Sequence, residues 1–390
     1  MAPHPSLTPQ NILAAHALIK PYIRETPVLT SKSLNALAST PQSPEALIGT
    51  PFEGQKPADP KLNFFFKCEN FQRIGAFKAR GAFHALLRLV EREGAEVVRG
   101  RGVVTHSSGN HAQALSLAAA TLSIPATIVM PSTSSPLKIA GTHAHNPRLL
   151  FSGPTSQERE AVVADVIKET NAFLIPPYDA VDIVLGQGTV GVEVERQVGE
   201  LVVGREPGLS VHVHGKKERE GGKGQLLDAI ITPLGGGGLT AGVATWFSDK
   251  PGTRVFGAEP AFEGADDCRR SLETGERVRF VKSTTIADGL RTPVGEVPWG
   301  VISDKSRVEG VYAVSERQIR EAMRLVWERV KVVVEPSAVV PLAVALFDEG
   351  WRGMVERVCA AEGIEGWDVG IVFSGGNVAV EGIGGLFTKD

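Results

Sequence analysis

Short runs of β-branched and aliphatic residues alternate with longer segments of helical periodicity along the chain. The runs are Gly102–Val104, Ala126–Met130, Asp228–Ile231, Arg254–Ala258 and Val369–Phe373. The helical segments include Asn110–Thr121, Glu158–Glu169, Leu239–Phe247 and Glu316–Val330. Strands that alternate with helices predict an α/β fold, in which mainly parallel sheets carry helices on both faces. Ligands of such folds bind beyond the carboxyl ends of the strands.

Two segments interrupt this alternation and are predicted to be surface loops. Ser39–Pro60 contains five prolines and two glycines, and His212–Gln225 is charged and rich in glycine. His212 and His214 are two residues apart, but no third ligand follows at a useful spacing, which disfavours a metal site there.

Composition narrows the class of protein. The chain has 390 residues, enough for two domains of roughly 100–200 residues each, and a formal net charge of −3. That balance does not favour binding to nucleic acid or to an anionic membrane. Three scattered cysteines cannot all pair, so we expect a reducing, cytoplasmic location. No signal peptide and no run of about 18 apolar residues is found, so no membrane segment is expected.

Lys78 is the first residue with candidate chemistry. Gly75 suggests a tight turn into a helix that begins near Phe77, which places Lys78 at a helix N-terminus. The helix dipole disfavours an extra positive charge there, and a lysine with a lowered pKa is what a Schiff base requires. Taken alone, a single lysine is more often a solvated surface charge.

A small polar turn follows the predicted strand that ends at Val104. The segment Thr105–Leu115 reads THSSGNHAQAL, and its backbone N–H groups, with the Ser108 hydroxyl, suit a carboxylate. An ordinary serine or asparagine helix cap is the simpler interpretation of this turn in isolation.

Four consecutive glycines, Gly235–Gly238, join another predicted strand to a helix. They allow several N–H groups to point at one phosphate, with the helix dipole behind them. The same stretch also matches a dinucleotide fingerprint, and Glu259 follows at the spacing of a ribose-binding acid. On this segment alone, an NAD-dependent oxidoreductase remains open. Ser374 ends a fourth strand, where its hydroxyl can bond a heterocyclic nitrogen.

Taken together and in this order, the four motifs resemble the serine racemase and serine/threonine dehydratase family. These are pyridoxal-phosphate (PLP) enzymes of the tryptophan-synthase-β fold, also called fold type II. The motifs are Phe-Lys-x-Arg-Gly-Ala, Ser-Ser-Gly-Asn-His, Gly-Gly-Gly-Gly-Leu and Ser-Gly-Gly-Asn. The resemblance extends from about Thr8 to about Val378. It implies a large PLP-binding domain of residues 1–101 and 180–390, and a small mobile domain of residues 102–179 that closes the cleft.

The resemblance also implies roles for individual residues. Lys78 would form the Schiff base and take the substrate α-proton, and Ser108 would be the acid/base on the opposite face. The implied cofactor contacts are Phe77, Lys78, Asn110, Tyr178, Gly235, Gly236, Gly237, Gly238, Leu239 and Ser374. The implied substrate contacts are Ser107, Ser108, Asn110, His111 and Arg159.

A site for Mg²⁺ or Ca²⁺ is implied in the same way. Glu259, the carbonyl of Ala265 and Asp267 are the expected ligands, and such oxygen ligands suit a hard cation. The loop is about two residues longer than the family pattern, so Asp266 or Glu263 could replace one of them.

The resemblance therefore predicts α,β-elimination or racemisation of serine, threonine or a related β-hydroxy amino acid such as threo-3-hydroxyaspartate. Elimination would give a keto acid and ammonia, and a homodimer is expected. A β-replacement synthase or another PLP lyase of this fold is the nearest alternative. A PLP-binding protein without turnover and an NAD-dependent oxidoreductase are more distant ones.

Overall fold

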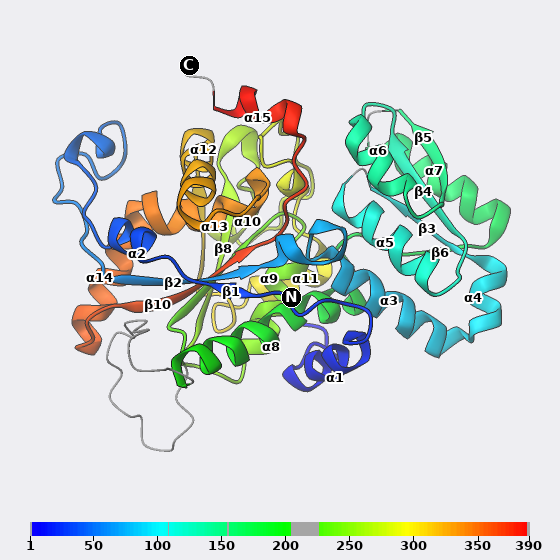
Figure 1. Cartoon of the computed structure of the whole chain (residues 1–390), viewed down its shortest axis with the longest axis horizontal. Helices are drawn as coiled ribbons and strands as arrows, with labels where there is room; N and C mark the ends of the chain where they lie inside the picture. Colours follow the sequence, from blue (N-terminus) through cyan, green and yellow to red (C-terminus); the bar gives the residue numbers. More distant parts are fainter. Residues whose placement is uncertain (1, 108, 154–155, 204–225, 388–390) are drawn as a thin grey trace.

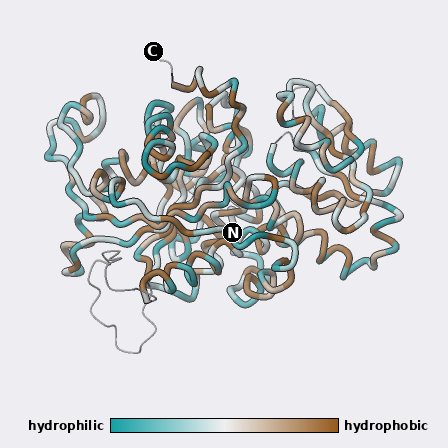
Figure 2. Tube along the Cα trace, viewed as in Figure 1, coloured by the Kyte–Doolittle hydropathy of each residue, from teal (hydrophilic) through white to brown (hydrophobic). Residues whose placement is uncertain are grey.

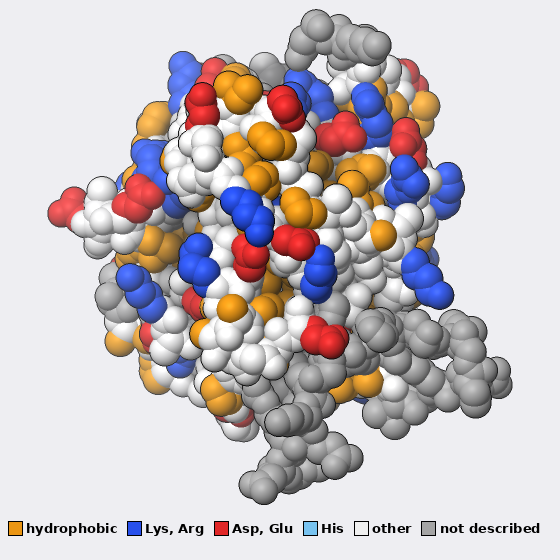
Figure 3. All heavy atoms as spheres, turned by 90° about the vertical axis from the view of Figure 1, so that its left-hand side faces the viewer, with side chains coloured by type: hydrophobic (Ala, Val, Ile, Leu, Met, Phe, Trp, Pro, Cys, Tyr) orange, Lys and Arg blue, Asp and Glu red, His pale blue; other side chains and the backbone are white. Residues whose placement is uncertain are grey.

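The computed structural model describes residues 2–107, 109–153, 156–203 and 226–387. Within these ranges the strands form two sheets, one of six strands and one of four (Figure 1). None of the helices in these ranges combines the length and the apolar character needed to cross a bilayer. On the face shown in Figure 3, acidic and basic side chains are interspersed and neither sign forms a large field.

The larger sheet has the strand order β1-β2-β10-β7-β8-β9. Its strands are β1 (Val28–Leu29), β2 (Leu62–Cys68), β7 (Ala229–Pro233), β8 (Arg254–Pro260), β9 (Gly310–Val314) and β10 (Trp367–Phe373). Neighbouring strands are parallel except for β1, which pairs with β2 in the antiparallel direction. Every residue of β2 and β10 is buried, as expected of parallel strands that are covered on both faces.

Side chains of β2 alternate between two hydrophobic cores, one on each face of the larger sheet. Phe64 and Phe66 pack into the first core, whereas Phe65 packs into the second. The first core includes residues of α2 (Lys32–Ala38), α12 (Glu316–Leu325), α13 (Pro336–Phe347) and α14 (Glu349–Glu362). The second includes residues of α1 (Pro9–Ile19), α8 (Val181–Val203), α9 (Gly238–Phe247), α10 (Asp267–Thr274) and α11 (Glu296–Ile302). The predicted α/β architecture is confirmed, and Figure 2 shows hydrophobic residues concentrated along the central strands.

The smaller sheet has the order β5-β4-β3-β6, and all its pairs are parallel. Its strands are β3 (Val103–His106), β4 (Ala126–Pro131), β5 (Arg148–Ser152) and β6 (Phe173–Leu174). Two helices cover one face, α3 (Lys78–Glu93) and α5 (Asn110–Thr121), and α7 (Ser156–Thr170) covers the other. Two short helices complete this part, α4 (Ala95–Arg101) and α6 (Pro136–His143).

The α3 helix lies between the two sheets (Figure 1). Its residues Phe83 and Leu86 share a core with β3 and α5, while the same helix also packs against α8. The predicted boundary at residue 101 assigns α3 and α4 to the large domain. Their apolar side chains, however, pack in the same hydrophobic core as those of the smaller sheet. The domain limits stay predictions.

The two predicted surface loops differ in what the structure describes. Residues 39–60 contain the 3-10 helix η1 (Pro44–Leu47) and a series of turns, and most of their side chains are exposed. Residues 212–225 lie outside the described residues. The chain continues after β10 to a short final helix, α15 (Val380–Leu386).

A buried cluster of four charged side chains joins α3 to the larger sheet. Arg80 Nε donates to Glu69 Oε2 at 2.7 Å, and Arg80 Nη1 donates to Glu193 Oε1 at 2.7 Å. Lys67 Nζ donates to Glu193 Oε2 at 2.6 Å. Each of the four side chains is at most 1% exposed. Burial by itself would lower the pKa of Arg80, but the two carboxylates raise it above its ordinary value, so the cluster holds two cations against two anions.

Removing Arg80 should be strongly destabilising. We expect Arg80→Ala to lower the free energy of unfolding by about 3–5 kcal/mol, because it leaves Glu69 and Glu193 buried with one cation between them. Urea unfolding of the purified protein measures this. The matched control is Arg88→Ala on the same helix, whose one ion pair with a described residue is the exposed pair with Glu91, and it should cost less than about 1 kcal/mol. Equal losses in both variants would contradict a special role for the cluster.

Candidate functional site

The Lys78 side chain begins α3 beside the carboxyl end of β10. The N–H of Phe77 donates to Ser374 O at 3.0 Å, and Ala76 forms a β-bridge with Gly375. Lys78 Nζ donates to Pro177 O at 2.8 Å. Burial lowers the pKa of Lys78 to about 8, and the N-terminus of α3 acts in the same direction. About one tenth of the amine is therefore neutral at pH 7, far more than for a solvated lysine, and a Schiff-base lysine requires this neutral form.

The four glycines form the turn between β7 and α9. Gly237 has a φ of 85°, in the left-handed region that favours glycine. A Cβ on Gly236 would lie 2.2 Å from the ring of Tyr178, so this aromatic ring rests directly on the turn. All four glycines are buried, and the N–H groups of Gly235, Gly236 and Gly237 find no protein acceptor in the part of the chain that is described. Buried free donors at the start of a ten-residue helix fit a phosphate group.

Asn110 lies at the start of α5 and is held by two side chains outside the smaller sheet, Glu335 at the N-terminus of α13 and Asn377 in the segment after β10. Its Nδ2 donates to Glu335 Oε1 at 2.8 Å, and its Oδ1 accepts from Asn377 Nδ2 at 2.8 Å. Burial raises the pKa of Glu335 to about 8, with a further contribution from Asp288, so this acid is neutral at pH 7. Neither Glu335 nor Asn377 was given a role from the sequence. The Glu-Pro-Ser stretch at the start of α13, with Glu335 as its N-cap, was the available signal.

Two of the substrate residues implied by the sequence, Ser107 and His111, follow the carboxyl end of β3. Ser107 Oγ accepts from the N–H of Gly109 at 3.3 Å. His111 Nε2 lies 3.2 Å from Ile175 O, and burial, followed by the charge of Lys78, lowers the pKa of His111 to about 3. This imidazole is therefore neutral.

Arg159 on α7 reaches the same edge of the smaller sheet. The pKa of His106 is lowered, mainly by burial and next by the charge of Arg159. Arg159 therefore lies near His106, at the end of β3. Ser108 lies outside the described residues. The structure thus groups Lys78 with Phe77, Tyr178, the glycine turn and Ser374, and it joins Asn110 to them through Glu335 and Gly375. The Leu239 side chain points into the core next to α9.

Two buried carboxyl groups face each other at the predicted cation site. Glu259 ends β8 and accepts from the N–H groups of Cys268 and Arg269, each at 2.9 Å. Asp267 Oδ2 accepts from Val294 N at 3.0 Å, whereas its buried Oδ1 has no hydrogen-bond partner. Burial raises the pKa of both groups, and Asp267 raises that of Glu259 further. An orphaned carboxylate oxygen beside a second acid fits a divalent cation, with the Ala265 carbonyl as the third predicted ligand.

The two replacement ligands considered from the sequence are engaged elsewhere. Asp266 pairs with Arg269 and with Arg270, in the latter case at 3.1 Å. Glu263 is exposed and accepts from Thr284 at 2.6 Å and 2.7 Å. Among the described residues, no group of three or more histidine, cysteine, aspartate or glutamate side chains has metal-binding geometry, so a cation here would depend on the two acids and the predicted carbonyl ligand.

Residues 45–361 match a protein family described as pyridoxal-phosphate dependent enzyme. The chain belongs to this family. The chain is 38% identical to a serine racemase of Arabidopsis thaliana over 369 residues, which covers 94% of this chain and 92% of the relative. It is 34% identical to a β-hydroxyaspartate dehydratase of Paracoccus denitrificans, covering 96% and 97% of the two chains. A solved structure of maize serine racemase matches with a TM-score of 0.77 at 34% identity, covering 97% and 96%.

Membership of the PLP family removes the dinucleotide interpretation of the glycine run. Glu259, the acid that would have bound a ribose, is fully buried, and both its oxygens already accept backbone N–H groups. The predicted family, fold and enzyme class are confirmed by the matches to this PLP family and to its racemase and dehydratase members.

The neutral state of Glu335 predicts how stability changes with pH. Folding raises the pKa of Glu335 from 4.5 to about 8, so the folded chain binds more protons between these values and its stability falls as pH rises through them. Glu335→Gln retains an oxygen acceptor for Asn110 and cannot ionise. We expect the unfolding free energy of this variant, relative to the unmodified protein, to rise by about 3–4 kcal/mol from pH 5 to pH 8.

Urea unfolding at several pH values measures this difference. Glu328→Gln, which alters an exposed glutamate, is the control and should show a constant difference. A flat profile for Glu335→Gln would show that Glu335 is ionised in the folded chain.

Proposed function

We propose that this chain binds PLP through Lys78 and catalyses elimination of water from a β-hydroxy amino acid, racemisation of that amino acid, or both. The substrate class is serine, threonine or threo-3-hydroxyaspartate. The observation that carries the proposal is the position of Lys78, whose pKa is about 8, beside a glycine turn with unpaired buried N–H groups. The named activities of the relatives support the same class of reaction.

When bound, PLP withdraws electrons from the α-carbon of the substrate amino acid. Gly235–Leu239 would hold the phosphate, Asn110 the 3′-oxygen of the ring and Ser374 its pyridine nitrogen. A hydroxyl is a neutral partner for that nitrogen, so Ser374 does not require it to be protonated. Such an environment favours departure of the β-hydroxyl as negative charge develops at the α-carbon, which is the elimination reaction.

The chain's own residues would hold and move the substrate protons. Lys78 Nζ would take the α-proton on one face, and the Ser108 hydroxyl would act on the other. Ser107, His111 and Arg159 surround the predicted carboxylate position, and Arg159 supplies its positive charge. Racemisation needs groups on both faces, whereas elimination of one enantiomer needs only one.

The proposal also includes a bound cation. Glu259, the Ala265 carbonyl and Asp267 would hold Mg²⁺ or Ca²⁺ at the end of β8, where the cation would neutralise two buried acids. Homodimer assembly and a cytoplasmic location stay predictions.

Replacing Lys78 tests the cofactor assignment. Lys78→Ala should lose the near-visible absorbance that shifts on adding L-serine, and the covalent attachment that borohydride traps. Pyruvate formation should fall by at least about 10²–10⁴-fold. Lys61→Ala, which alters an exposed lysine, should behave as the unmodified protein does. Normal turnover by Lys78→Ala would overturn the assignment, and a product that appears only with added thiol would favour a β-replacement synthase.

Replacing Ser108 tests the second face. Ser108→Ala should abolish formation of D-serine from L-serine, because the opposite face loses its acid/base, while pyruvate formation from L-serine stays within about tenfold. Chiral chromatography and a coupled pyruvate assay follow both products in one reaction. If both activities fall equally, Ser108 only positions the substrate.

A further inference from the structure

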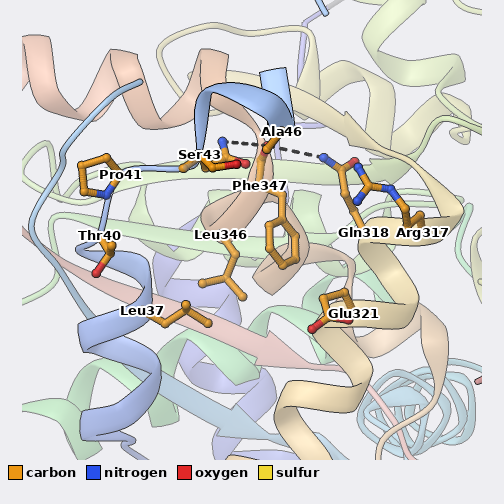
Figure 4. Close-up of a pocket in the computed structure, with 11 residues that line it drawn as sticks. Leu37, Thr40, Pro41, Ser43, Ala46, Arg317, Gln318, Glu321, Leu346 and Phe347 are labelled. Atoms are coloured by element: carbon orange, nitrogen blue, oxygen red, sulfur yellow. Dashed lines mark hydrogen bonds between the residues drawn. The ribbon is translucent and has the colours of Figure 1, made fainter. Parts of the chain in front are cut away.

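A cavity of about 310 Å³ lies between α2, η1, α12 and α13, and none of the predicted site residues lines it. We call it the α12–α13 cavity. Leu37, Leu346 and Phe347 form its apolar floor (Figure 4). The amide nitrogens of Gln42 and Gln318 both donate to Phe347 O at 3.4 Å. The size and the mainly apolar lining are those of a site for a small organic molecule.

One wall of the cavity is formed by the start of the 39–60 segment, and this wall is firmly attached. Arg352 on α14 is fully buried. It donates to Ala38 O at 2.8 Å, to Thr40 O at 2.9 Å and to Ala58 O at 3.3 Å. Both ends of the segment are thus bound to the same guanidinium group. The cavity is therefore preformed, which reduces the entropic cost of binding a ligand.

The charged side chains that line the cavity, Arg317 and Glu321, indicate which class of ligand it would bind. Glu321 faces Arg324 at 3.7 Å, so its charge is already matched. Arg317, one turn earlier on α12, is exposed and forms no ion pair with any described residue. The apolar floor with one unmatched guanidinium fits an organic anion that has an apolar body.

The α13 helix connects the cavity to the functional site. Phe347 ends α13 in the cavity, and Glu335 precedes its first residue and holds Asn110. Twelve residues of helix span about 18 Å.

The α12 helix makes a second connection. Glu316 is adjacent to Arg317, and its carboxylate accepts from Thr285 Oγ1 at 2.5 Å and from Ile286 N at 2.9 Å. Two residues further, Asp288 pairs with Lys138 of α6. The α12 and α13 helices, which line the cavity, therefore both support polar contacts between the parts of the chain that contain the two sheets.

We propose that the α12–α13 cavity is a regulatory site for a small carboxylate with an apolar body, and that its occupation increases activity. A ligand between α2 and α12 stabilises the arrangement of α12 and α13 in which the Asn110–Glu335 and Lys138–Asp288 contacts are formed. The regulatory effect rests on the proposed function, whereas binding to the cavity does not.

The probe is 4-phenylbutyrate, and the uncharged 4-phenylbutanamide is its matched partner. Isothermal titration of the full-length PLP-loaded protein measures binding of both. We expect the acid to bind and Arg317→Ala to weaken it roughly fivefold to tenfold, with little effect on the amide. Ala46→Trp, which fills the cavity from η1, should abolish binding. Arg329→Ala, an exposed arginine that follows α12, is the control and should bind normally.

Steady-state kinetics of pyruvate formation provide the second measurement. We expect 4-phenylbutyrate to lower the KM for L-serine in the unmodified protein and in Arg329→Ala, but not in Ala46→Trp. Unchanged binding in both Arg317→Ala and Ala46→Trp would overturn the site. Binding that is lost in these variants but leaves KM unaltered in the unmodified protein would overturn the regulatory role. A chain that neither eliminates water from serine, threonine or threo-3-hydroxyaspartate nor racemises them would contradict the proposed function, and the titrations would still decide whether the cavity binds the acid.

Discussion

The position of Arg80 determines how the two parts of this molecule meet. Arg80 lies two residues after Lys78, and its guanidinium is neutralised by Glu69, which directly follows β2, and by Glu193 on α8. A buried cation of this kind is tolerated only where both acids are correctly placed, so α3 cannot rotate or slide without leaving charge unpaired. Because Lys78 begins the same helix, the cluster also fixes the direction in which the reactive amine enters the site.

The hydrophobic runs in the sequence correspond to five of the ten described strands, β3, β4, β7, β8 and β10, and local patterns were insufficient where a contact is distant in sequence. The run Ala126–Met130 corresponds to β4, and Val369–Phe373 corresponds to most of β10. The two-residue strand β1 has no periodicity to detect, and its antiparallel pairing depends on β2. The location of α3 between the sheets depends on Glu193, 113 residues after Arg80. No window of hydrophobic pattern contains that information.

The residues of the candidate site also divide into those with a local signal in the sequence and those that depend on distant residues. Lys78 and the glycine turn could be proposed from the sequence because their expected chemistry depends on neighbours in the chain, namely a helix N-terminus and a run of glycines. Glu335 was missed because its hydrogen-bond partner, Asn110, lies 225 residues earlier in the chain. The burial that raises its pKa cannot be read from the residues next to it in the sequence. At the predicted cation site, the extra loop length left the choice of acid open in the sequence. The structure limits that choice, because Asp266 and Glu263 have other partners.

The contacts across the cleft are of a kind that separates and re-forms easily. Lys138 and Asp288 are both partly exposed, and an ion pair in that setting contributes at most about 1 kcal/mol. Asn110 meets an acid that burial keeps neutral, so breaking this hydrogen bond releases no buried charge. These contacts are therefore weaker than the fully buried ion pairs of the Arg80 cluster. Strong, fully buried pairs fix the start of α3, whereas weak pairs join the two parts of the chain at the place where the proposed function would require movement for substrate entry and release.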